Sequence, residues 1–202
     1  MHVPEDRRKA DGGFTLVELM VVVLIMGILM AIAIPTLLSA TSAADRTAAT
    51  SDLVNALTNA EAIYDSSSRS FGPSSALVSA LGSDDPSFTF TTGAALNGVH
   101  AEVSVWTNGK PTTPSGKSGA TAGTEVVLAA QAKGTSTCYY LDDVEATLAA
   151  AGPAGRTAPG TYYASAPGVP GRGCAAGPRV DPRPGAGSGA WSNTERAGWA
   201  PS

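Results

Sequence analysis

The chain has 202 residues, a length that suits one medium-sized domain with extensions. Charged residues make up 15% of it, and the net charge of −4 comes with scattered basic residues, which argues against a nucleic-acid-binding face. Two cysteines and two histidines are a thin supply of ligands for a metal site built from Cys and His.

The N-terminal part of the chain contains an apolar run from Phe14 to Ile34, directly after a basic cluster at positions 7–9. Its 21 residues match the roughly 20 that a helix needs to cross a bilayer, and Glu18 is the only charge within it. The positive-inside rule places the N-terminus in the cytoplasm and the chain after about Thr36 outside. A secretory signal peptide is the alternative, but its apolar region would be shorter, about 7–15 residues.

Residues 36–65 continue in helical style and become amphipathic. The apolar positions at helical spacing are Leu53, Leu57, Ala60 and Tyr64. Pro35 lacks a backbone donor and crowds the preceding turn, so we expect a kink there, between a first half at 14–35 and this second half. Serines at 66–68 and the pair Gly72-Pro73 are expected to end the helix.

Residues 66–151 are expected to form a small α+β head in which strands pack on the amphipathic half of the helix. Alternating apolar residues predict strands at 87–91, 99–107, 124–132 and 135–141. Gly134 separates the last two strands and favours a hairpin. The acidic start and the glycine stop of residues 142–152 predict a short helix.

From Gly152 onward the composition shifts, because Gly and Pro supply 19 of the last 51 residues. Such a segment forms no core of its own, so a loop at 152–176 and a mobile tail at 177–202 are expected. Trp191 and Trp199 are unusual in such a tail, and the sequence assigns them no role.

The residues around Glu18 resemble the N-terminal signature of type IV pilins and of the related pseudopilins of type II secretion. The resemblance rests on Gly13, Phe14, the Glu18 spacing, the apolar run and Pro35. It implies that residues 1–13 are a leader peptide, which a membrane-embedded prepilin peptidase removes by cutting between Gly13 and Phe14. The same enzyme would methylate the new N-terminal Phe14, and the fold would be pilin-like.

The resemblance also suggests what Glu18 does. After cleavage, the free amine of Phe14 on one subunit and the Glu18 carboxylate of a neighbour can compensate each other in a medium of low dielectric constant. Glu18 would then set the register of subunits during assembly. Cys138 and Cys174 resemble the ends of the disulfide-bounded C-terminal region of many pilins, although two free thiols stay possible.

The resemblance implies a structural subunit of an extracellular filament, held in the cytoplasmic membrane before assembly and at the cell surface afterwards. Its partners would be the prepilin peptidase, copies of itself and related pilins, an assembly ATPase and a platform protein. A secretion pseudopilin is the first alternative. The second is a single-span, membrane-anchored binding protein that never polymerises.

No motif in the sequence points to an enzyme or to a cofactor. The segment around Lys117 lacks the first glycine of a phosphate-binding loop, because that position is Pro111. His100 has no evident catalytic partners and is better read as a strand-surface residue. The pairs Asp84-Asp85 and Asp142-Asp143 could bind calcium, as acidic loops of some pseudopilins do, but a turn and a helix start explain them more simply.

Overall fold

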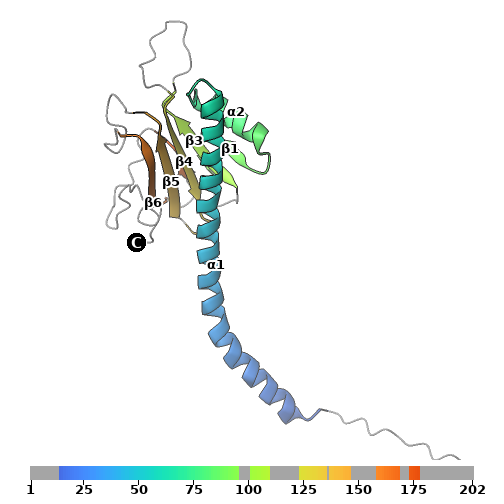
Figure 1. The fold of residues 1–202 in the computed structure, drawn as a ribbon. Coiled ribbons are helices and arrows are strands. Elements are labelled where there is room, and N and C mark those ends of the chain that lie inside the picture. The colour runs from blue at the N-terminus through green and yellow to red at the C-terminus, as the bar shows by residue number, and fades with distance from the viewer. Residues whose placement is uncertain are drawn as a thin grey trace, which may run out of the picture. The chain divides into compact units, whose positions relative to one another are not determined.

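The structure is a computed structural model (Figure 1), and its described residues are 14–95, 101–109, 123–135, 137–146, 158–168 and 173–177. These fall into two compact units, Met1–Thr41 and Ser42–Ser202. The predicted leader and most of the predicted tail, with Trp191 and Trp199, lie outside the described residues. The same holds for His100 and the segment around Lys117.

Helix α1 spans Leu16–Ser66 without interruption and contains Pro35. Its end at Ser66 agrees with the stop that the serine run predicts. The hydroxyl of Thr36 donates a hydrogen bond to the carbonyl of Ala33 at 2.9 Å, one turn back along the helix. Such back-bonding is compatible with a helix that continues past a proline, and the kink at Pro35 stays a prediction.

Helix α2, Ser74–Asp84, was not predicted from the sequence. It starts directly after Pro73, which occupies its N-cap position, whereas α1 has already ended at Ser66. Leu77 and Leu81 lie one turn apart, and both are fully buried. Two buried leucines are a short signal, and for that reason the helix was missed.

Five strands form the main sheet, in the spatial order β1-β3-β4-β5-β6. They are β1 Thr89–Thr91, β3 Glu102–Thr107, β4 Glu125–Gln131, β5 Thr137–Val144 and β6 Gly160–Pro167. All neighbours pair antiparallel except β1 and β3, which are parallel. The expected α+β fold with a small, mostly antiparallel sheet is confirmed.

Four of these strands lie where alternation predicted them. Gly134 has a φ of +71° in the turn between β4 and β5, so the predicted hairpin is present and uses a conformation that glycine adopts without strain.

The helix predicted from Asp142 is wrong at its start, because Asp142 to Val144 complete β5 and pair with strands on both sides. Ladder hydrogen bonds to two neighbours outweigh a local helix-start signal.

Strand β6 corrects a second expectation. The Gly- and Pro-rich composition after Gly152 predicted loop, yet Gly160–Pro167 pairs with β5 along its whole length. This short run, TYYASAP after Gly160, is rich in residues that favour strands, and the surrounding glycines and prolines concealed it. Backbone pairing with β5 holds this run in a strand conformation.

The sheet has two different faces, and α1 lies across one of them (Figure 1). The core on this face joins the second half of α1 to α2 and to alternate strand residues. Its members include Leu53, Tyr64, Leu81, Leu128 and Leu141. All four positions that helical spacing selected in α1 are buried, which confirms the predicted core-facing side of this helix.

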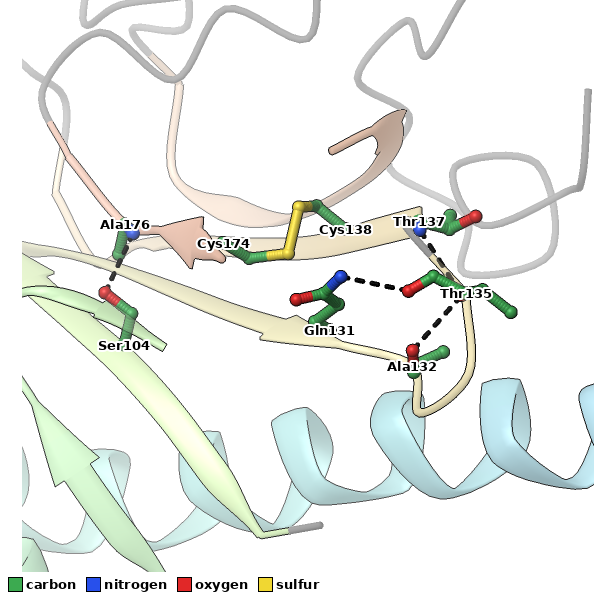
Figure 2. The surroundings of a disulfide bond; sticks show 8 residues. All are labelled: Ser104, Gln131, Ala132, Thr135, Thr137, Cys138, Cys174 and Ala176. Atoms are coloured by element: carbon green, nitrogen blue, oxygen red, sulfur yellow. Dashed lines mark hydrogen bonds between the residues drawn. A yellow bond between two sulfur atoms is a disulfide. The ribbon is translucent and has the colours of Figure 1, made fainter. Parts of the chain in front are cut away.

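The opposite face of the sheet carries a smaller core and a disulfide bond. Strands β2, Ala94–Ala95, and β7, Cys174–Ala175, pair as a separate two-stranded sheet. Figure 2 shows the disulfide between Cys174 and Cys138, whose Cα atoms are 5.5 Å apart, and the hydrogen bond from the Ala176 amide to the hydroxyl of Ser104. These bonds attach the β7 segment to the middle of the main sheet.

Candidate functional site at the start of α1

The candidate site begins with Phe14, which lies just ahead of α1 and is 87% exposed. Gly13, the other half of the predicted cleavage site, lies outside the described residues. Thr15 follows in a non-helical conformation, and the first helical residue is Leu16. Thr15 therefore occupies the N-cap position, and Glu18 is the third residue of the helix.

Thr15 and Glu18 form a reciprocal capping box. The Glu18 amide donates to the Thr15 hydroxyl oxygen at 3.2 Å. In return, Glu18 Oε2 accepts the Thr15 amide at 3.1 Å and the Thr15 hydroxyl at 3.2 Å. Two of the amides that a helix start leaves without a partner are thereby satisfied.

The capping box gives Glu18 a local role in addition to the assembly role that the resemblance implies. The signal was present, because threonine followed three residues later by glutamate, before an apolar run, is the pattern of a capping box. A carboxylate in the first turn also interacts favourably with the positive end of the helix dipole. Glu18 therefore helps to fix where α1 begins, whatever contact it makes with a second molecule.

Beyond the capping box, the first part of α1 exposes nearly every large apolar side chain. The exposed set includes Leu16, Met20, Leu24, Leu29 and Ile34. Among the described residues, α1 is the one helix with a stretch long and apolar enough to cross a membrane, and that stretch is not buried within the chain. Exposed apolar surface of this extent marks contact with lipid or with other protein.

The remaining predicted site residues come later in the chain. Pro35 lies further along α1, and Cys138 and Cys174 form the disulfide on the far face of the sheet. Asp142 and Asp143 are consecutive in β5 and so point to opposite faces, which excludes a shared ligand set made by that pair alone. Asp85 accepts hydrogen bonds from the backbone and hydroxyl of Ser87, as expected for a turn.

Comparison with known proteins agrees with the placement of this site. Residues 8–34 match the family model of the prokaryotic N-terminal methylation motif. A curated relative, the type II secretion system core protein G of Klebsiella michiganensis, is 48% identical over 48 residues. That alignment covers 24% of this chain and 34% of the relative, so the chain matches about a third of that protein's length. No solved structure matches the chain with significance.

Proposed function

We propose that this chain, which carries the prepilin-type N-terminal signature shared by type IV pilins and type II secretion pseudopilins, is a structural subunit of an extracellular filament. The observation that carries the proposal is the match over residues 8–34, at the point where the structure places an exposed Phe14, a capped helix start and an uncovered apolar helix surface. The proposed role is structural rather than enzymatic.

The proposed life cycle uses each part of the N-terminal segment. The chain enters the cytoplasmic membrane through α1, with residues 1–13 inside the cell. A prepilin peptidase then cuts after Gly13 and methylates Phe14. Assembly moves the apolar first part of α1 from lipid into contact with other subunits, which keeps its apolar surface away from water. An assembly ATPase and a platform protein would drive this transfer.

Pairing between the Phe14 amine and Glu18 of a neighbouring subunit is the proposed basis of register. In the structure, Glu18 Oε2 already accepts two hydrogen bonds from Thr15, whereas an ionised carboxylate has room for about four. The capping box and an intermolecular ion pair are therefore compatible. Charge compensation matters because an isolated charge in lipid costs about 2.5–3.5 kcal/mol on insertion scales.

A secretion pseudopilin is a second candidate, favoured by the similarity to a type II secretion core protein. The disulfide between Cys138 and Cys174 is the feature that favours a pilus-type subunit instead, by resemblance to the disulfide-bounded region of pilins. Both candidates share processing and helix-to-helix assembly. They differ in the extent of the filament: a pilus extends beyond the cell surface, whereas a pseudopilus stays within the cell envelope.

Fractionation of the producing cells tests the proposal. We expect the chain in two pools, a detergent-soluble membrane pool and a sedimenting filament pool, the latter released from the cell surface by shearing for a pilus. Electron microscopy with antibodies against the head would show labelled filaments. A chain that stays wholly in the membrane pool, in cells whose assembly machinery is active, would instead identify a membrane-anchored binding protein.

A further inference from the structure

Three carboxylates from two elements lie together where the end of β5 faces α1. Glu61 comes from α1, Asp143 from the penultimate position of β5, and Glu145 from the residue just after that strand. One ligand oxygen of each lies within 4.8 Å of the others. Asp143 and Glu145 are two residues apart and so share one side of the sheet, the side on which Tyr139 and Leu141 contribute to the α1 core.

Asp143 is the buried member of this carboxylate cluster, and it is 4% exposed. Its Oδ1 accepts a hydrogen bond of 2.9 Å from the hydroxyl of Thr161, which is its register partner on β6. Its Oδ2 is buried and accepts no hydrogen bond. The neighbouring carboxylate of Glu145 is an acceptor too, so the two can bond only if one holds a proton. A buried anionic oxygen without a donor is costly and calls for a proton or a cation.

The surroundings of the carboxylate cluster add negative charge. Burial raises the pKa of Glu61, and the charges of Glu145 and Asp65 raise it further. Burial likewise raises the pKa of Glu145, followed by the charges of Asp143 and Asp65, while Arg69 lowers it. Within the described part of the chain, no lysine or arginine forms an ion pair with any of the three. The cluster thus combines surplus negative charge with an unsatisfied buried oxygen.

We propose that Glu61, Asp143 and Glu145 form a binding site for a divalent cation of the calcium type, which joins α1 to the end of β5. Calcium takes oxygen ligands at about 2.3–2.6 Å, so two ligands of one ion lie at most about 5 Å apart. The ligand oxygens of the carboxylate cluster lie within 4.8 Å of one another and so meet that limit.

The ion would act as a cross-link between a helix and a strand that are far apart in the sequence. Three protein carboxylates leave several coordination positions to water, which places the expected dissociation constant near the weak extracellular class, about 10⁻⁴–10⁻³ M. Binding only to the folded chain stabilises it by mass action. At tenfold excess over the dissociation constant we expect the melting temperature to rise by roughly 3–6 °C. This site does not depend on the proposed filament role.

The test compares melting of the full chain in detergent with and without calcium. The protein is treated with EDTA, dialysed, and melted in CaCl₂ or in NaCl of equal ionic strength. We expect the wild-type chain to melt higher in calcium. Asp143→Asn keeps the size of the side chain but removes the buried charge, and should abolish the calcium response. Asp84→Asn removes an exposed carboxylate on α2 and should leave the response intact.

A second variant and a second measurement keep the proposal falsifiable if Asp143→Asn does not fold. Glu145→Gln affects a less buried ligand and should weaken calcium binding at least tenfold in isothermal titration calorimetry, in which the wild type should bind one ion. An equal calcium response in the wild type and in the folded ligand variants would overturn the site. So would a wild-type chain that is stabilised by acid but not by calcium, because its carboxylates would share a proton only.

Discussion

Replacement of Glu18 by glutamine separates the two roles that the structure and the filament proposal give this residue. The glutamine carbonyl can still accept the Thr15 amide and hydroxyl, because capping boxes use glutamine as well as glutamate. The charge that would face the Phe14 amine of a neighbour is lost. The reciprocal variant, Thr15→Val, keeps the Glu18 charge and removes the hydroxyl that caps the helix.

The two variants differ in expected size as well as in mechanism. Loss of an N-cap side chain costs about 1 kcal/mol, a factor of roughly five in an equilibrium constant. An uncompensated charge in the bilayer costs about 2.5–3.5 kcal/mol, or a factor of about 50 to 400. We therefore expect Glu18→Gln to reduce the assembled fraction far more than Thr15→Val. Glu18→Ala loses both interactions and should assemble no better than Glu18→Gln.

The assay measures the ratio of sheared filament to membrane-bound chain by quantitative immunoblot. Each variant is first checked for removal of the leader, because an uncut chain would fail to assemble for a different reason. If Glu18→Gln assembles at the wild-type level while Thr15→Val does not, the charge-compensation argument is wrong. The capping box would then be the whole role of Glu18.

Three further predictions concern the folded head. Cys174→Ser removes the disulfide that closes a loop with a sequence separation of 36 residues, and this should lower the free energy of unfolding by about 4 kcal/mol in the chain-entropy model. Chemical denaturation without reductant measures this loss. Addition of reductant should lower the denaturation midpoint of the wild type to that of the variant. Leu53→Ala removes a side chain that is 0% exposed and should cost about 2–5 kcal/mol, whereas Val54→Ala, at a position that is 37% exposed, should change little in the same melts. In EDTA, the raised pKa values of the carboxylate cluster mean that the folded state binds protons more readily than the unfolded state. Stability should therefore rise as the pH falls from 7 through the folded pKa values toward about 4, and a double Glu61→Gln, Glu145→Gln variant should show a smaller rise.

The regular parts of the fold follow from periodicity in the sequence. Val103 and Val105 alternate with Ser104 and Trp106, and the structure puts the two valines in the α1 core. The apolar spacing of α1 likewise marks its buried side. The sequence predicts these elements because each of them buries one side only. Its apolar residues therefore recur with the period of the helix or the strand.

Where strand pairing decides the outcome, local signals mislead. Asp142 and Asp143 look like a helix start, but β4 and β6 hold them in the sheet. Strand β6 was missed because the composition of its surroundings concealed a short run of strand-forming residues. Pairing between segments distant in the sequence is not encoded in either segment alone.

The same difference between local and long-range contacts applies to the candidate sites. The capping box of Thr15 and Glu18 is local, so its spacing was available in the sequence and was overlooked. The carboxylate cluster joins Glu61 to Asp143 and Glu145, and only the packing of α1 on the sheet brings them together. The sequence offered the neighbouring pair Asp142-Asp143 as a calcium site but favoured a helix start there, and strand β5 directs the two side chains to opposite faces.

Mass spectrometry of the mature N-terminus tests the filament account most directly. We expect the chain from native membranes to begin at Phe14 and this residue to carry one methyl group on its amine. We also expect a bulky substitution at Gly13 to leave the leader in place and to abolish the methylated species. A chain that keeps Met1, or one cut after Ala40 as a secretory signal peptide would be, would contradict the account.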